Sequence, residues 1–240
     1  MATKDTEHGF LARPAADGPR PGVVLIPDVR GLYDHFRELA QRLAGEGFVV
    51  LAVDLYRDTG PPEITSPAAA MRWIRELPDP QVLGDLQAAI DFLAAHPAVA
   101  GRRVGIIGLC MGGQYAILAA CGCTGLSACA PFYGMLAYPL GLDPGIKPRS
   151  PLDAAPDLSC PLLGFYGERD PLIPLHQVEA FRERLAATGR PAELRVYAGA
   201  GHAFMNDSQP DRFHAESAAD AWPRLVGFLR EQLAAEGDAA

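Results

Sequence analysis

Residues 104–113, Val-Gly-Ile-Ile-Gly-Leu-Cys-Met-Gly-Gly, join an apolar β-type run directly to a helix-forming segment. They carry the pattern Gly-x-Cys-x-Gly, a nucleophile elbow with cysteine in the serine position. Gly108 and Gly112 lack the Cβ atoms that a sharp strand-to-helix turn would crowd. The turn places Cys110 at a helix N-terminus, where the positive end of the helix dipole favours a thiolate. A tight turn around a buried structural cysteine is the alternative interpretation of this motif taken alone.

Apolar strand patterns and helical patterns alternate along the rest of the chain. Strands are expected at 9–12, 23–26, 48–53, 102–107, 126–133, 162–166 and 192–197. Helices are expected at 33–44, 68–77, 82–95, 114–120, 175–188 and 215–233, with a break at 78–80. This alternation predicts an α/β fold with a mostly parallel sheet and helices on both faces, in which 9–12 is a short edge strand.

Three segments are expected to lack regular structure. Residues 134–159 are rich in proline and glycine and predict a long excursion over the sheet, of a length typical of a functional loop or a lid. Residues 17–21 predict a turn, and residues 236–240 are expected to fray. The chain of 240 residues is long enough for a large core, and we interpret 1–240 as a single domain.

Composition narrows the class of protein. The formal charge of -8 argues against nucleic acid or an anionic membrane as a partner. The first residues lack the apolar core of a signal peptide, and no apolar run reaches membrane-spanning length, so we expect a cytoplasmic protein. Its five cysteines should then be reduced. Cys121 and Cys123 lack Cys-x-x-Cys spacing, so we interpret them as small buried hydrophobes rather than a metal or redox pair.

Two further motifs follow expected strands. Gly-Glu-Arg-Asp-Pro ends at residue 171, and Ala-Gly-Ala-Gly-His-Ala-Phe ends at residue 204. The order Cys110, Asp170, His202 along the chain is the nucleophile–acid–histidine order of α/β-hydrolases. His202 would take the thiol proton, and Asp170 would hold the other ring nitrogen.

A tetrahedral oxyanion needs two hydrogen-bond donors. One is expected to be the backbone N–H of Met111, directly after the nucleophile. The other is expected to be the backbone N–H of Val29, in the loop after the strand 23–26. The three motifs together predict nucleophilic acyl transfer at one edge of the sheet.

These motifs resemble the dienelactone hydrolase (carboxymethylenebutenolidase) family over about residues 20–230. The segments that carry the resemblance are 23–31, 49–56, 108–113, 132–134, 167–174 and 199–204. The resemblance implies a Cys-His-Asp triad that opens cyclic lactones or cleaves related esters through a thioester, with no metal and no cofactor. It also implies a small-molecule lactone or ester as the partner, and it favours a monomer.

The chain departs from the family pattern at three positions. Asp28 stands where the family places a glutamate that contacts the resting thiol, so Asp28 would contact Cys110 or else only bind the backbone of its own turn. Asn206 stands where characterised members bind the substrate carboxylate with an arginine, which argues against dienelactone itself as the substrate. Arg30 replaces a frequent aromatic residue and would either anchor a substrate carboxylate or be solvated.

Four apolar residues are candidates for the pocket lining: Tyr133, Phe204, Met71 and Trp73, with core packing as the alternative for the last two. A general carboxylesterase or thioesterase would use the same machinery on other acyl groups. A non-catalytic binding member of the fold predicts the loss of a triad residue, whereas all three are present. A redox-sensing thiol would leave the acid and the histidine unexplained.

Overall fold

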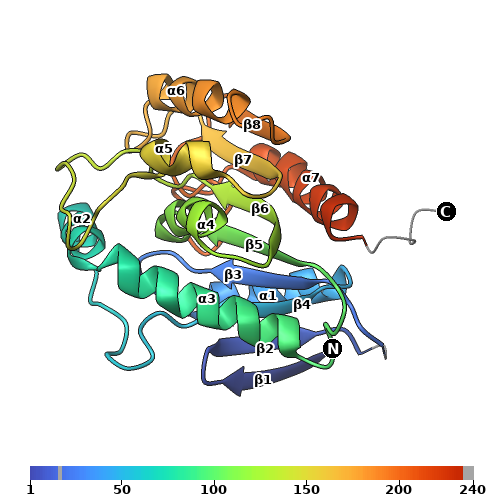
Figure 1. Ribbon diagram of the computed structural model, residues 1–240. Helices are drawn as coiled ribbons and strands as arrows, with labels where there is room; N and C mark the ends of the chain where they lie inside the picture. The colour runs from blue at the N-terminus through green and yellow to red at the C-terminus, as the bar shows by residue number, and fades with distance from the viewer. Residues whose placement is uncertain (16–17, 235–240) are drawn as a thin grey trace.

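The computed structural model describes residues 1–15 and 18–234, in which eight strands form one sheet (Figure 1). The strand order is β1-β2-β4-β3-β5-β6-β7-β8. The pairs β1–β2 and β2–β4 are antiparallel and the others are parallel, which confirms the predicted α/β class. The strands are β1 (Ala2–Thr6), β2 (Gly9–Arg13), β3 (Gly22–Ile26), β4 (Val49–Val53), β5 (Val104–Leu109), β6 (Leu126–Phe132), β7 (Leu162–Gly167) and β8 (Ala192–Tyr197).

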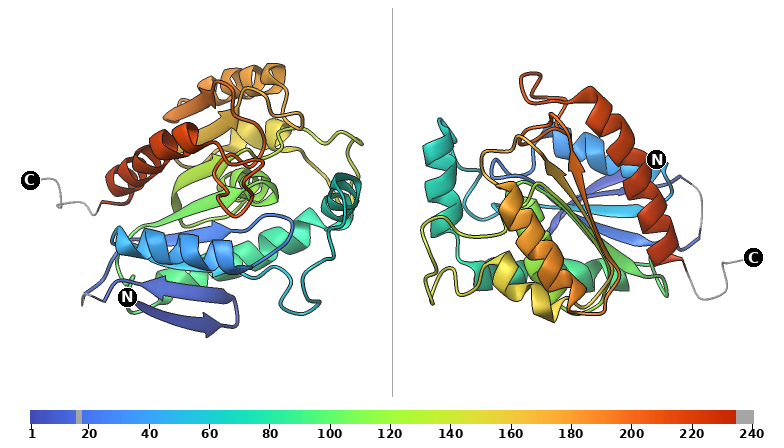
Figure 2. Two further views of the ribbon diagram at one scale, coloured as in Figure 1. Left: turned by 180° about the vertical axis from the view of Figure 1, so that it is seen from behind. Right: turned by 90° about the horizontal axis from the view of Figure 1, so that it is seen from above.

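Helices cover both faces of the sheet. Helices α3, α4, α5 and α6 lie on the face turned to the viewer in Figure 1, and α1 and α7 lie on the opposite face, as Figure 2 shows from behind. Helix α2 stands beyond the ends of the strands and covers neither face. The bounds are α1 (Asp34–Gly45), α2 (Pro67–Glu76), α3 (Asp79–Ala95), α4 (Met111–Gly122), α5 (Pro151–Ala154), the 3-10 helix η1 (Ala155–Asp157), α6 (Leu175–Ala186) and α7 (Ala215–Leu233).

The middle of the sheet forms the core. Every residue of β3, β4 and β5 is buried, because helices pack on both faces. Such strands are continuous apolar runs rather than alternating ones, which is why the sequence revealed them. Strands β3 and β5 pair in parallel, with Ile26 opposite Gly108. This register places the loop after β3 directly beside the elbow that follows β5.

The N-terminal part of the sheet differs from expectation. The predicted edge strand, β2, lies inside the sheet between β1 and β4, and β1 is the edge. Strand β1 contains Lys4 and Asp5 and is almost wholly exposed, so it shows no apolar pattern. Charged edge strands of this kind resist pairing with other chains.

The helix break predicted at 78–80 is shorter than expected. Helix α3 begins at Asp79, three residues earlier than predicted, with Pro78 as its N-cap. Pro80 occupies one of the first two positions of the helix, where no intrahelical partner for an N–H is needed. Proline therefore starts this helix instead of interrupting it.

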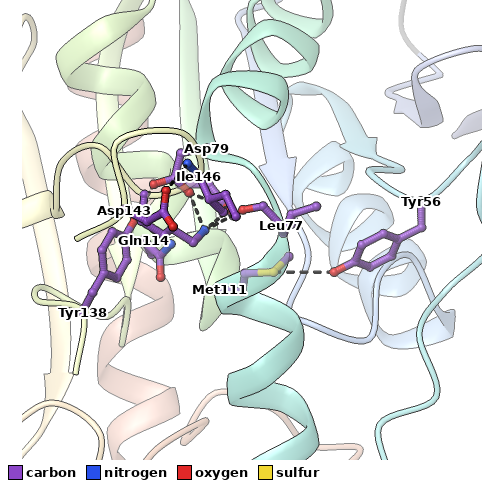
Figure 3. Close-up of polar contacts among 10 residues, drawn as sticks. Tyr56, Leu77, Asp79, Met111, Gln114, Tyr138, Asp143 and Ile146 are labelled. Atoms are coloured by element: carbon purple, nitrogen blue, oxygen red, sulfur yellow. Dashed lines mark hydrogen bonds and ion pairs between the residues drawn. The ribbon is translucent and has the colours of Figure 1, made fainter. Parts of the chain in front are cut away.

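A buried ion pair holds the long excursion after β6 (Figure 3). Lys147 Nζ binds the carboxylate of Asp79 and donates to the carbonyl of Leu77 (2.8 Å) and the hydroxyl of Tyr115 (3.0 Å). Tyr138 donates to the other oxygen of Asp79 at 2.7 Å. We name this group the Lys147 cluster; its members are Lys147, Asp79, Tyr115, Tyr138 and Gln114. It ties the excursion to the start of α3 and to α4.

Other expectations concern the chain ends and the thiols. The end expected to fray, 236–240, and Asp17 at the start of an expected turn lie outside the described residues. Within 1–15 and 18–234, no helix combines the length and the apolar character needed to cross a membrane. The five cysteines are free thiols, and Cys123, Cys129 and Cys160 are buried.

Candidate active site

Cys110 occupies the elbow between β5 and α4 in a backbone conformation with φ 58° and ψ -118°. Non-glycine residues seldom adopt positive φ, because Cβ then crowds the backbone. A Cβ at Gly108 would lie 1.9 Å from the carbonyl oxygen of Gly112, and one at Gly112 would lie 2.2 Å from that of Ile26. Both glycines of the motif are therefore required by backbone contacts of the turn.

The structure brings Cys110, His202 and Asp170 into one hydrogen-bonded chain. Sγ of Cys110 lies 3.2 Å from Nε2 of His202, and Nδ1 of His202 lies 2.7 Å from Oδ2 of Asp170. The three residues follow β5, β8 and β7, whose carboxyl ends share one edge of the sheet. The other oxygen of Asp170 accepts from the backbone N–H of Leu172 at 2.8 Å, which fixes the carboxylate.

The charges around His202 favour its protonated form. Burial by itself lowers the pKa of His202, but the adjacent Cys110 and Asp170 outweigh burial and raise this pKa to about 10. This shift favours the imidazolium form of His202. An imidazolium hydrogen-bonded to Cys110 can form an ion pair with its sulfur, and the thiolate is the nucleophilic form of cysteine.

A cavity of about 680 Å³ opens at Cys110 and His202. Its apolar lining includes Phe36, Ile64, Ala70, Met71 and Ile74. Its polar lining includes Asn206, Gln209, Arg212 and His214. Of the residues that the structure describes, none in 134–159 lines this cavity, so the excursion is not its lid. Helix α2 and the segment before it contribute to the lining instead, through residues 64–67, 70, 71 and 74.

Backbone strain is concentrated around this cavity. In the described part of the chain, three non-glycine residues have positive φ: Cys110 (58°), Tyr133 (37°) and Ala203 (64°). All three line the cavity. Such conformations cost about 1–3 kcal/mol each and persist where the surrounding structure enforces them, often at functional sites.

The two expected oxyanion donors lie on either side of Cys110. Val29 lines the cavity in the loop after β3, and Met111 is the first residue of α4. The N–H of a first helical residue has no intrahelical acceptor. The hydroxyl of Tyr56 donates to the carbonyl of Val29 at 3.2 Å and lies 3.6 Å from Sδ of Met111.

Asp28 lines the cavity but hydrogen-bonds its own loop. Its Oδ1 accepts from the N–H of Arg30 (2.8 Å), and its Oδ2 accepts from the hydroxyl of Tyr33 (3.0 Å). Asn206 donates to the same hydroxyl at 2.9 Å, so Asn206 is linked to Asp28 through Tyr33. The guanidinium of Arg30 lines the cavity, 3.6 Å from Asp28. Burial raises the pKa of Asp28, which the hydrogen bond from Arg30 opposes.

The four pocket candidates separate into two groups. Tyr133 and Met71 line the cavity, and the ring of Tyr133 meets that of His202 edge-on at 5.2 Å. Phe204 is fully buried against Tyr133 and lies outside the lining, because the turn after His202 directs it into the core. Trp73 also lies outside the lining, since its indole N–H donates to Tyr56 at 3.1 Å.

Sequence reasoning missed Tyr33 and Tyr56. A signal for Tyr56 was available, because this residue follows β4, which lies next to β3 in the sheet. Loops that follow neighbouring parallel strands meet at one edge. No comparable pattern pointed to Tyr33, whose role depends on Asn206, 173 positions away.

This chain is similar to known proteins in sequence and in fold. A family model described as "Dienelactone hydrolase family" matches residues 8–233. An Escherichia coli (strain K12) protein with the name "Putative carboxymethylenebutenolidase" is 36% identical over 95% of this chain and 83% of its own length. A Bradyrhizobium sp protein with the name "Probable 2-oxo-3-(5-oxofuran-2-ylidene)propanoate lactonase" is 34% identical over 95% of this chain and 91% of its own length. The crystal structure of a "Putative Dienelactone Hydrolase" from Klebsiella pneumoniae subsp. pneumoniae MGH 78578 matches with a TM-score of 0.85 at 36% identity, covering 92% of both chains.

Proposed function

This chain belongs to the dienelactone hydrolase family, and we propose that it hydrolyses a lactone or another carboxylic ester with Cys110 as the nucleophile. One observation carries the proposal: a hydrogen-bonded chain runs from Cys110 through His202 to Asp170 at a cavity of substrate size. The lactonase name of one relative supports a cyclic ester as the substrate class.

Acylation starts when the sulfur of Cys110 attacks the ester carbonyl carbon. The S–C bond forms as the carbonyl π pair moves onto oxygen, and the backbone amides of Met111 and Val29 bind that oxyanion. Loss of one such donor typically costs about 10²–10³ in rate. The C–O bond then breaks, and the imidazolium of His202 gives its Nε2 proton to the leaving oxygen. In a lactone the released alcohol stays attached to the acyl group, so the ring opens.

Deacylation returns the enzyme to its starting state. A water molecule attacks the thioester while neutral His202 takes one of its protons. The C–S bond breaks, sulfur leaves as a thiolate, and the imidazolium faces it again. Asp170 keeps Nδ1–H of His202 in place throughout. One ester and one water give one acid and one alcohol.

The cavity walls suggest how a substrate is oriented. An acyl chain would lie against the apolar residues of α2, and a substrate carboxylate would meet Arg30. Asp28 lies beside Arg30 and competes with such an anion. A general carboxylesterase or thioesterase is the second candidate, favoured by the apolar lining and by Asn206 in place of an arginine.

Hydrolysis of a dienelactone, simple lactones and short p-nitrophenyl esters tests the proposal. Wild type should turn over at least one member and accumulate an acyl group on Cys110, detected by mass spectrometry. Cys110→Ala should lose turnover by roughly 10⁴-fold or more. Cys121→Ala, at the far end of the same helix, should match wild type. Turnover that survives in Cys110→Ala contradicts the proposal, and the preferred substrate separates a lactonase from a general esterase.

A further inference from the structure

The hydroxyl of Tyr56 contacts both residues whose amides would bind the oxyanion. Figure 3 shows its contact with Met111. It donates to the carbonyl of Val29 and contacts the thioether of Met111. The indole N–H of Trp73 donates to the same hydroxyl from helix α2. Tyr56 is 2% exposed and is not among the cavity-lining residues, so it acts through its neighbours.

These contacts fix two consecutive peptides of the loop after β3. The carbonyl of Asp28 accepts from the N–H of Gly31 at 2.9 Å, so the N–H of Val29, in the same trans peptide, points the opposite way. The next peptide is held at its carbonyl by Tyr56 and at its N–H by the Asp28 carboxylate. Of the four polar groups in these peptides, only the N–H of Val29 lacks a hydrogen-bond partner within the described residues. A buried amide without a partner beside a cavity is available to an acceptor that arrives with the substrate.

Packing accounts for the ring of Tyr56 but not for its hydroxyl. A Cβ at Gly31 would lie 2.7 Å from the ring, and the ring of Trp73 meets it edge-on at 5.9 Å. Phenylalanine would make the same contacts. Burial raises the pKa of Tyr56, so its hydroxyl keeps the proton that it donates to Val29.

We propose that Tyr56 is a positioning residue of the oxyanion site, which holds Val29 and Met111 in register, and that Trp73 fixes the Tyr56 hydroxyl from helix α2. The inference rests on the proposed function, because the oxyanion exists only if Cys110 attacks a carbonyl. Displacing one donor costs catalysis without removing any group that touches substrate.

A trifluoromethyl ketone and iodoacetamide separate this role from a structural one. The sulfur of Cys110 adds to the ketone carbon, the π pair moves to oxygen, and the resulting oxyanion needs both amides. Iodoacetamide is attacked by the same sulfur and loses iodide, with no oxyanion formed. In Tyr56→Phe, the ketone concentration that half-protects Cys110 should rise about 10- to 100-fold, with kcat falling in parallel. Alkylation without ketone should stay within about twofold of wild type.

Tyr138→Phe is the matched control, because it also removes a tyrosine hydroxyl hydrogen-bonded inside the protein. It should leave ketone protection unchanged. If Tyr56→Phe does not fold, Trp73→Phe replaces it, with an expected loss of about threefold to tenfold. The inference is overturned if the ketone protects Cys110 of the folded Tyr56→Phe protein as well as it protects wild type. The same holds for Trp73→Phe where that variant replaces it. Either result leaves the proposed function standing. A ketone that fails to protect wild-type Cys110 overturns the cysteine mechanism and the inference with it.

Discussion

Helix α4 carries two buried charged clusters about one turn apart, and they differ in kind. At its N-terminus, Cys110 joins the His202–Asp170 pair and opens into the cavity. One turn on, Tyr115 joins the Lys147–Asp79 pair, in which both charged side chains are at most 3% exposed. Each cluster holds an aspartate, a cation and a third residue from the elbow helix.

The two clusters differ in the hydrogen bonding of one central group, the Lys147 ammonium or the Cys110 sulfur. The ammonium of Lys147 has three protein acceptors, which is all that it can use. The sulfur of Cys110 has His202 as its partner, lines the cavity and sits on a backbone with positive φ. Burial and charge are therefore common to structural and reactive clusters, and an accessible nucleophile on a strained backbone distinguishes the reactive one.

The same substitution in the two aspartates tests this distinction most directly. Asp170→Asn would present an amide N–H to Nδ1 of His202, which leaves the ring proton on Nε2 and prevents that atom from accepting one. We expect kcat to fall by roughly 10⁴-fold with little loss of stability. Steady-state hydrolysis and thermal unfolding measure the two effects. A stability loss without a rate loss would place Asp170 with the structural aspartates.

Asp79→Asn should show the reverse behaviour. It leaves the ammonium of Lys147 buried without its counter-charge, which costs about 3–5 kcal/mol of unfolding free energy. Burial lowers the pKa of Lys147, so without Asp79 the Lys147 amine binds fewer protons in the folded state than in the unfolded state. The loss of unfolding free energy should therefore shrink as pH rises. Urea unfolding at pH 7 and pH 9 checks this. A kcat per folded molecule more than about threefold below wild type would contradict the structural assignment.

The pH dependence of kcat/KM provides a third test. The pKa of His202 is raised from 6.5 to about 10, so stability from its protonation is fully present below pH 6.5 and is lost as pH rises through about 10. The rate should fall about tenfold per pH unit above that value, because a neutral ring cannot protonate the leaving oxygen. Asp170→Asn should move this decrease in kcat/KM to lower pH, whereas Asp79→Asn should leave it where it is in wild type. A flat wild-type profile up to pH 11 would exclude the imidazolium from the mechanism.

Asp28 is the intermediate case, because it lines the cavity yet bonds backbone as a structural residue does. Asp28→Asn keeps the carbonyl oxygen that Arg30 needs but removes the charge, so we expect turnover to fall about threefold to tenfold with the fold preserved. Asp143→Asn is the control, since Asp143 accepts from the N–H of Gly145 in a similar turn outside the cavity lining. Equal rates in wild type and Asp28→Asn would remove Asp28 from the mechanism.

The sequence predicted the strands and the turn that depend on a local pattern of residues. Strands β3, β4 and β5 are continuous apolar runs, and the glycines on either side of Cys110 indicate a sharp turn there. It could not reveal β1, whose exposed polar residues follow no periodicity. Nor could it place Tyr56, whose partners Val29 and Trp73 lie 27 and 17 positions away and meet it only after folding. A residue that acts through another residue has no characteristic spacing along the sequence by which it could be recognised.

Helix α2 has a practical consequence for protein engineering. It stands clear of the sheet and contributes Ala70 and Met71 to the cavity wall, so a randomised library at these two positions can alter substrate preference, whereas Ile74 on the same helix belongs to the buried core. Trp73, on the same helix, is the position to hold constant, because its indole is hydrogen-bonded to Tyr56. The positions to randomise and the position to keep constant thus lie on one ten-residue helix, which is a favourable starting point for directed evolution.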